Sequence, residues 1–135
     1  VERFILPDGF ITTDFMLNRL NSVISKLVVY PENMMKNLNL TGGLVFSQRI
    51  LLELPLKNVS REDAYKIVQR NAMKVWEDLQ QGKPALNTQG ESLYLQNLLA
   101  DEELRASLSE SEIRECFDYS YYTKNVDKIF QRVFK

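Results

Sequence analysis

The clearest pattern in the chain is a run of apolar residues at helical spacing between Ser60 and Gly82. One face of this run collects seven apolar positions, Ala64, Ile67, Val68, Ala72, Val75, Trp76 and Leu79. Residues three and four positions apart share one side of an α-helix, so the run predicts an amphipathic helix packed on a core. Ser60 with Asp63 resembles a capping box at its start, and Gly82 followed by Pro84 ends it.

A second run near the N-terminus predicts a longer helix with a wider apolar stripe. The helix begins with Thr12 or Thr13 as its N-cap, and Pro31 marks its end or a kink. Its stripe comprises Met16, Leu17, Leu20, Val23, Ile24, Leu27, Val28 and Val29. A helix that is apolar over so wide an arc normally lies in a bundle and touches more than one neighbour. Residues 1–11 are expected to be extended or looped, because Pro7-Asp8-Gly9 favours a turn.

Between these two helices the pattern predicts a polar connection and one short helix. Residues 31–43 are mostly polar, with one helical turn expected around residues 32–38 and an end at Gly42-Gly43. The next segment carries Leu44, Phe46, Ile50, Leu51 and Leu54 at helical spacing. It is therefore predicted to be a short, very apolar helix that Pro55 stops.

The C-terminal part is predicted to hold a loop followed by several short helices. Residues 82–91 form the loop, and the first short helix carries Leu93, Leu95, Leu98 and Leu99. One or two turns are expected in residues 101–108, and Ser109 with Glu112 is a second capping-box candidate. The last helix begins near Asp118 and should point Tyr122, Val126, Ile129 or Phe130, and Val133 inward. Because no alternating strands bounded by hairpin turns occur, the fold class is predicted to be all-α.

Composition and charge exclude several kinds of function. The 135 residues carry 17 Lys and Arg against 18 Asp and Glu, so the net charge of −1 gives no electrostatic reason to expect nucleic acid or an anionic membrane. No segment approaches the roughly 20 consecutive apolar residues that span a bilayer. The chain contains no His, which excludes a His-dependent hydrolase triad and a His-based metal site. A single Cys, Cys116, cannot form an intrachain disulfide and is expected to be a buried structural thiol, as in a cytosolic protein.

Acidic and aromatic clusters are the first candidates for chemistry. Glu102 with Glu103, or Glu110 with Glu112, could act as paired carboxylates, but positions beside predicted helix starts favour charges that complement the helix dipole. The tyrosines at 119, 121 and 122, near Lys124, could stack on nucleic-acid bases. At this net charge, helix packing is the favoured interpretation.

Four further features leave structural and functional interpretations open. Gly42-Gly43 before a helix could bind a phosphate or serve as a hinge. Ser47-Gln48-Arg49 and Gln69-Arg70-Asn71 could be functional triplets or the polar faces of their helices. Arg3 follows Val1-Glu2 at the start of the chain, where a guanidinium could bind a phosphate or a carboxylate.

Longer strings in the sequence carry a resemblance. They are Val1–Asp8 with Asp14–Leu20, Val29–Met34, Leu40–Arg49, Ser60–Tyr65 with Val68–Met73, and the ending Tyr121-Tyr122 with Asn125–Phe134. Together and in this order they resemble the adenylosuccinate lyases of the fumarase/aspartase superfamily, and they cover essentially the whole chain. The family's chains are several times longer, so the resemblance implies that this chain begins near the end of the central helical bundle.

The resemblance implies a fold, an assembly and a reaction. Residues 1–30 would end the central bundle domain, and residues 31–135 would form the C-terminal helical domain. The intact enzyme would be a cytoplasmic homotetramer of purine biosynthesis, with active sites built from several subunits. It would release fumarate by β-elimination from adenylosuccinate, giving AMP, and from the succinylated carboxamide ribotide. No organic cofactor, metal, nucleic acid or membrane partner is implied.

The resemblance transfers one site residue to this chain. In the family the catalytic base is a Ser on a mobile loop and the acid is a His, and neither matches a position in this sequence. A family string resembling Ser-Ser-Val-Glu-Arg holds the substrate's phosphate end, and Val1-Glu2-Arg3 matches its last three positions. Arg3 is therefore the expected substrate-binding residue, and the chain alone is predicted to be inactive.

Two alternatives remain open. The chain could be an autonomous helical interaction module, which should bury the stripe of helix 12–30 internally, whereas the lyase interpretation predicts that this stripe has no partner within the chain. It could also derive from a relative such as fumarate hydratase or argininosuccinate lyase, although the C-terminal strings argue against that.

Overall fold

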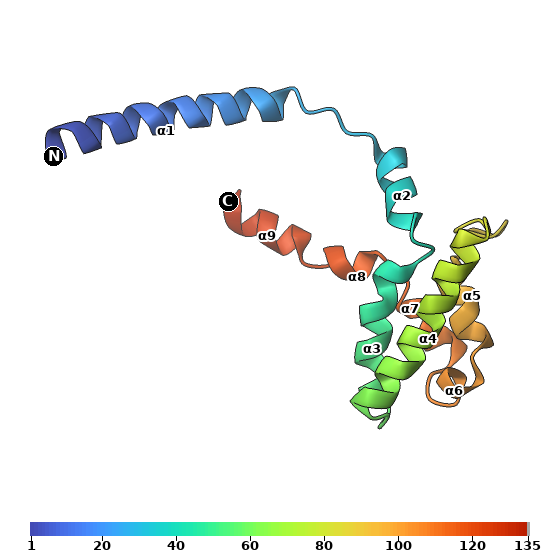
Figure 1. Cartoon of the computed structure of the whole chain (residues 1–135). Helices are drawn as coiled ribbons and strands as arrows, with labels where there is room; N and C mark the ends of the chain where they lie inside the picture. The colour runs from blue at the N-terminus through green and yellow to red at the C-terminus, as the bar shows by residue number, and fades with distance from the viewer. Residues whose placement is uncertain (135) are drawn as a thin grey trace. The chain divides into compact units, whose positions relative to one another are not determined.

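Residues 1–134 of the computed structural model are described, and they contain helices and no strand (Figure 1). In chain order the helices are α1 (Glu2–Ser25), α2 (Pro31–Asn39), the 3₁₀ turn η1 (Leu44–Phe46), α3 (Ser47–Leu56), α4 (Arg61–Gln80), α5 (Leu93–Ala100), α6 (Glu102–Arg105), α7 (Glu110–Glu115), α8 (Ser120–Thr123) and α9 (Val126–Val133). The only backbone pairing of the β type among the described residues is an isolated antiparallel bridge between Leu86 and Ser92. The all-α prediction is confirmed.

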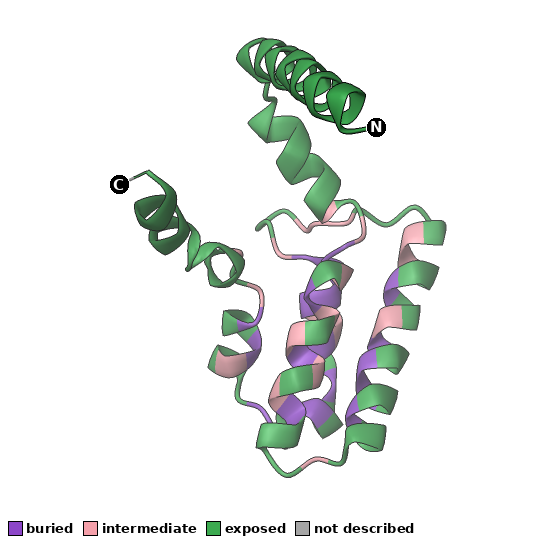
Figure 2. Ribbon diagram, turned by 90° about the vertical axis from the view of Figure 1, so that its left-hand side faces the viewer, coloured by how far each residue is buried: buried purple, intermediate pink, exposed green. Residues whose placement is uncertain are grey.

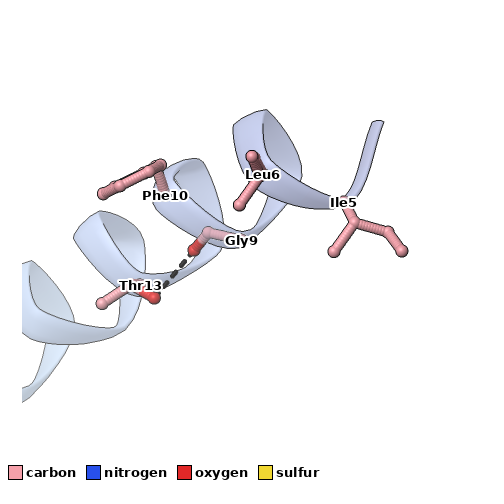
Figure 3. A pocket seen from close by; sticks show the side chains of 5 residues that line it. All are labelled: Ile5, Leu6, Gly9, Phe10 and Thr13. Carbon is pink, nitrogen blue, oxygen red and sulfur yellow. Dashed lines mark hydrogen bonds between the residues drawn. The ribbon is translucent and has the colours of Figure 1, made fainter. Parts of the chain in front are cut away.

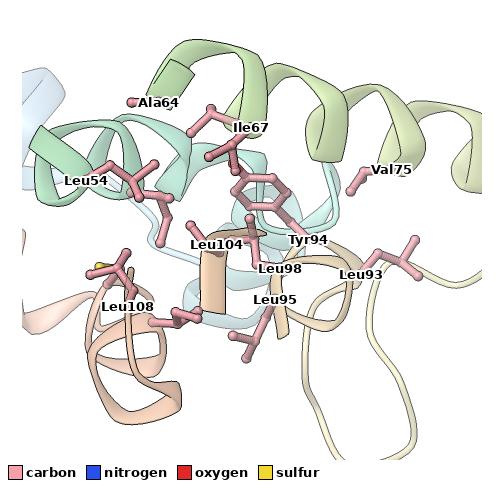
Figure 4. Packing of buried hydrophobic residues seen from close by; sticks show 14 residues of the cluster. Leu54, Ala64, Ile67, Val75, Leu93, Tyr94, Leu95, Leu98, Leu104 and Leu108 are labelled. Atoms are coloured by element: carbon pink, nitrogen blue, oxygen red, sulfur yellow. The ribbon is translucent and has the colours of Figure 1, made fainter. Parts of the chain in front are cut away.

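The hydrophobic core is formed by the helices from α3 to α7. Helix α4 packs against α3 and α5, and α5 also packs against α6 and α7. Figure 2 shows the buried positions on the inner sides of these helices, and Figure 4 shows their side chains converging. The core cluster consists of Ile50, Leu54, Ala64, Ile67, Val68, Val75, Leu93, Tyr94, Leu95, Leu98, Leu104, Leu108, Ile113 and Cys116. Each large side chain buried in this way contributes roughly 1.5–3 kcal/mol.

Side-chain caps begin the core helices at the predicted positions. The Ser60 hydroxyl accepts the Asp63 N–H at 3.1 Å and caps α4. At α7, Ser109 accepts the Glu112 N–H while the Glu112 carboxylate accepts the Ser109 N–H, which completes a capping box. The capping box at Ser109 is confirmed, and Ser60 is confirmed as an N-cap without a complete capping box, because the Asp63 carboxylate accepts the Ser60 hydroxyl instead.

The prediction for the N-terminal segment was wrong. Helix α1 begins at Glu2 and includes Pro7, so residues 1–11 are neither extended nor looped. Pro7 lies in the second turn, where its missing N–H leaves only the Arg3 carbonyl without its usual partner. The Thr13 hydroxyl, expected at an N-cap, instead donates to the Gly9 carbonyl at 2.7 Å within the helix (Figure 3).

The predicted helix also ends earlier than expected. Helix α1 stops at Ser25, and residues 27–30 have no regular structure. Pro31 begins α2 instead of ending or kinking the first helix, which fits the preference of proline for the first turn of a helix. The helix expected around residues 32–38 is confirmed, and with nine residues it is longer than the single turn predicted.

Contacts divide the chain into one unit of residues Val1–Asn33 and a second that begins at Met34. No residue of α1 is buried. The large apolar residues of the stripe at 16–29 are each more than half exposed. That the stripe has no partner within the chain stays a prediction of the lyase interpretation. The domain boundary between residues 30 and 31 stays a prediction.

Three further details differ from the prediction. Pro55 lies inside α3, which ends at Leu56. Trp76 is 47% exposed although the periodicity placed it on the core face of α4. The expected last helix is broken into α8 and α9, and its apolar residues are exposed because no described element covers them; they are Tyr122, Val126, Ile129, Phe130 and Val133.

Candidate functional site

Arg3, the predicted substrate-binding residue, lies in the first turn of α1. Its side chain is exposed, and none of the ion pairs among residues 1–134 includes it. The structure brings no other candidate residue to it. The nearby side chains of Ile5, Leu6 and Phe10 line only an open depression along α1 (Figure 3). A single helix cannot enclose a ligand, so Arg3 by itself is an incomplete site.

The candidate carboxylates have structural roles. Glu102 and Glu103 lie in the first turn of α6, where they complement the helix dipole. Glu112 belongs to the α7 capping box and forms an ion pair with Lys57 at 2.5 Å. The hydrogen bond from Lys57, with those from Ser109, lowers the pKa of Glu112 to about 2. A carboxylate with so low a pKa is ionised at neutral pH and cannot act as a general acid.

A buried polar cluster joins α4 to the start of α6, and the sequence did not reveal it. Asp101 accepts hydrogen bonds from the side chains of Arg70 and Asn71, both at 2.7 Å. Its other oxygen accepts the N–H groups of Glu103 and Leu104 and caps α6. Burial alone would raise the pKa of Asp101, but these hydrogen bonds lower it below its ordinary value. The cluster fastens two helices together rather than forming an open reactive centre.

The sequence signal for this cluster was present but ambiguous. Asn71 is fully buried, although it is the last residue of a triplet that could also have been the polar face of α4. Its position at i+3 from Val68 and i+4 from Ile67 places it on the core face by spacing alone. Gln69, by contrast, is exposed and fits the polar-face interpretation.

Arg49 and the C-terminal aromatic residues hold α8 against the core. The Arg49 guanidinium pairs with Glu53 at 2.8 Å and lies 3.7 Å from the centre of the Tyr121 ring. Tyr119 packs on Phe46 at a ring separation of 4.8 Å and donates its hydroxyl to Asn39. These contacts confirm packing as the role of Tyr119 and Tyr121, whereas Tyr122 is 55% exposed.

Cys116 lies in the same region and is buried, with burial raising its pKa. Its thiol donates to the Glu112 carbonyl. A buried thiol with a raised pKa is a poor nucleophile, so the prediction of a structural role is confirmed. Ser47 is half-buried at the start of α3, with no side-chain hydrogen bond among the described residues that would assign it chemistry.

One apolar groove of about 400 Å³ opens between α2, η1 and α8. We call it the α2–α8 groove, and its lining residues are Met35, Leu38, Val45, Phe46, Tyr119, Tyr122 and Thr123. Its walls carry almost no polar groups that could orient a small polar substrate. The groove is therefore better suited to an apolar side chain than to a nucleotide.

Comparison with known proteins decides the family. Residues 43–133 match the family model described as the adenylosuccinate lyase C-terminus. The chain belongs to this adenylosuccinate lyase family. It is 69% identical over 134 residues to an adenylosuccinate lyase of Helicobacter pylori strain J99, covering 99% of this chain and 30% of that protein. It is also 43% and 41% identical, each over 132 residues, to adenylosuccinate lyases of Thermotoga maritima and Bacillus subtilis, covering 98% of this chain and 28% of each of those proteins.

In this member of the adenylosuccinate lyase family, the matched region begins at the second residue of a closely packed glycine pair, Gly42-Gly43. Gly42 and Gly43 have φ angles of 62° and 90°, which an L-residue with a side chain rarely adopts. A Cβ atom on Gly43 would lie 2.7 Å from the Cβ of Ser92. The Gly42 carbonyl also accepts the Tyr94 N–H at 2.9 Å. The pair is thus required for packing against α5, and nothing in its geometry indicates a phosphate site.

The chain spans about 30% of the length of the curated adenylosuccinate lyases that it matches. The part described here includes no helix with the length and hydropathy needed to cross a membrane.

Proposed function

We propose that this chain is the C-terminal part of an adenylosuccinate lyase. The intact enzyme releases fumarate by β-elimination, from adenylosuccinate to give AMP and from the succinylated carboxamide ribotide in the same biosynthetic route. The observation that carries the proposal is the 69% identity to the Helicobacter pylori enzyme over nearly the whole chain. Adenylosuccinate is the proposed substrate, rather than that of another superfamily member, because the relatives reported above are named adenylosuccinate lyases.

The chain contributes structure and one binding group rather than the catalytic base or acid. It has no His, its thiol is buried, and Glu112 and Asp101 are held ionised by hydrogen bonds. Proton abstraction next to a carboxylate and protonation of the leaving nitrogen each need a positioned group of suitable pKa. Both groups come from the part of the enzyme that precedes Val1, and this chain alone is inactive.

Arg3 binds the phosphate end of the substrate in the intact enzyme. A guanidinium presents several N–H donors in a planar fork that matches phosphate oxygens. Arg3 is exposed and takes part in no ion pair among residues 1–134, which leaves these donors available. A single exposed ion pair contributes little in water, so Arg3 acts together with groups that the rest of the enzyme supplies.

Helix α1 joins the central bundle of a homotetramer. Its 24 residues carry a wide apolar stripe, and none of them is buried. Such a stripe is stable in water only when other helices cover it.

The lone buried thiol of Cys116 and the absence of any second Cys fit an enzyme of the cytoplasm.

Kinetics of the full-length parent enzyme test the proposal. The wild-type parent should release fumarate from adenylosuccinate. The R3M variant should raise KM about ten- to hundredfold, because it removes charge-assisted hydrogen bonds to the phosphate. The R105M variant, which removes an exposed arginine on α6, is the matched control and should leave KM unchanged. A parent that releases no fumarate would contradict the proposed activity, and an unchanged KM in R3M would contradict the role of Arg3.

A further inference from the structure

Helix α9 presents an apolar face that nothing in the described chain covers. Val126, Ile129, Phe130 and Val133 recur at i, i+3, i+4 and i+7, the spacing of one helix face. Ile129 and Phe130 are each 57% exposed. We call these four residues the α9 apolar face.

The helix that carries this face has little stability of its own. It has eight residues, and isolated helices shorter than about 12–15 residues are marginal in water. Asn125 makes no side-chain hydrogen bond at its N-cap, and no ion pair among residues 1–134 involves α9. Helix α7, shorter still, has a complete capping box and a buried residue, Ile113. What stabilises α9 must therefore be packing of its apolar face.

A second apolar surface, the α2–α8 groove, lies immediately before α9 in the chain. Tyr122 lines the groove from α8 and is 55% exposed, and only Lys124 and Asn125 separate α8 from α9. On α2, Met35 and Leu38 line the groove and are also exposed. An apolar groove next to an apolar helix face can receive a single partner element with side chains on both.

Size decides between the possible occupants. A stable interface between separate molecules buries about 800 Å² on each partner, which four half-exposed side chains and a small groove do not reach. A segment of the same polypeptide needs less area, because the covalent link has already met most of the entropic cost of association. Most of each relative's length lies outside the part that this chain matches, so such a segment exists in the parent.

We propose that the α9 apolar face and the α2–α8 groove form a docking surface for the part of the parent lyase chain that precedes Val1. This inference rests on the proposed function, because that function supplies the preceding chain. It adds a second contact surface, separate in sequence from α1. The catalytic part would thus contact the C-terminal part through both the first helix, α1, and the last helix, α9.

Hydrogen exchange tests the docking surface without requiring any substitution. The amide groups of residues 126–134 are compared in the full-length parent and in this 135-residue chain, each at two protein concentrations. We expect roughly tenfold or slower exchange in the parent, and fast exchange in the isolated chain at both concentrations. Equal exchange in the two proteins would overturn the proposal. Protection in the isolated chain that rises with concentration would also overturn it, because a second copy would then be the occupant.

A matched pair of variants of the parent locates the contact. F130D places a charge on the α9 apolar face, whereas Q131D places the same charge one residue further along, on the polar side. F130D should remove the protection of α9 and Q131D should retain it, with α3–α7 unchanged in both. Protection that survives F130D would contradict the proposal. Fumarate release by the wild-type parent is measured separately, so an inactive parent with a protected α9 would refute the proposed function and not the docking surface.

Discussion

Asp101 accepts the side-chain hydrogen bonds that connect α4 to the start of α6. Its carboxylate joins Arg70 and Asn71 on α4 to the backbone at the start of α6, and it is only 9% exposed. Removing it leaves the buried Asn71 amide without this acceptor and α6 without a cap. One side chain therefore both holds α4 against the start of α6 and caps α6.

Replacing Asp101 by Ala should lower the free energy of unfolding by about 2 kcal/mol, because buried hydrogen bonds to a charged group are lost. Urea denaturation monitored by circular dichroism measures the change. The E102A variant removes an exposed carboxylate from the adjacent position and should change stability by less than about 0.5 kcal/mol. Equal losses in the two variants would contradict the role assigned to the cluster.

Gly43 is required both for its backbone conformation and for lack of space, whereas Gly90 is required for its backbone conformation alone. Both have positive φ, but a Cβ on Gly43 meets Ser92, whereas a Cβ on Gly90 meets nothing within 4 Å. G43A should therefore be about 1–3 kcal/mol less stable than G90A, the difference being overpacking against Ser92. Thermal unfolding of the two variants provides the comparison, and similar melting temperatures would refute the close approach.

The ion pair between Glu112 and Lys57 predicts a dependence of stability on pH. The pKa of Glu112 falls from 4.5 to about 2 on folding, so its contribution is present above pH 4.5 and is lost as the pH falls toward 2. Stability should decrease over this range, and the decrease should be shallower in E112Q. The K57M variant, which removes the ion-pair partner of Glu112, should show a similarly shallow decrease. An E112Q slope equal to that of the wild type would show that this pair is not formed.

At the residue scale, local patterns could be predicted and distant ones could not. Ser60 and Ser109 cap their helices because their partners lie three positions along the chain, a relation visible in the sequence. Asp101 and Asn71 are 30 positions apart, and only the packing of α4 brings them together. Arg3 was identified through family resemblance, since its position alone marks no site.

Among the elements, α1 differs most from the helices of the core. The core helices α3–α7 each bury at least one apolar residue, and α1 buries none. Its continuation through Pro7 shows that one missing hydrogen bond near a helix start does not outweigh the rest of a 24-residue helix. Spacing predicts the face of a helix correctly, but the extent of a helix depends on the sum of many small preferences.

Helix α1 should drive association of the isolated chain. The double variant L20D/I24D places two charges on its apolar stripe and should shift the chain toward monomer in analytical ultracentrifugation, while circular dichroism shows the core still folded. The double variant N18D/N21D adds the same charge at polar positions of α1 and should associate as the wild type does. Global unfolding of L20D/I24D would instead favour the autonomous module, in which α1 belongs to the core.

For the molecule as a whole, one property of the apolar periodicity explains both its correct and its wrong predictions: the pattern marks which face of a helix is covered, but it does not identify the partner. It correctly placed an all-α core around α4, because the partners of those helices lie within the chain. It wrongly turned Val126, Ile129 and Val133 inward, because a helical pattern shows that a face is covered and not what covers it. The uncovered faces of α1 and α9 are what a C-terminal part of a larger enzyme should display.

The most direct test of this account is reconstitution of lyase activity from two pieces. This chain is mixed with a separately produced upstream part of the same adenylosuccinate lyase, and fumarate release from adenylosuccinate is followed, with each piece alone as the control. The account predicts release by the mixture and none by either piece. Fumarate release by this chain alone, or by the upstream part alone at the rate of the mixture, would contradict it.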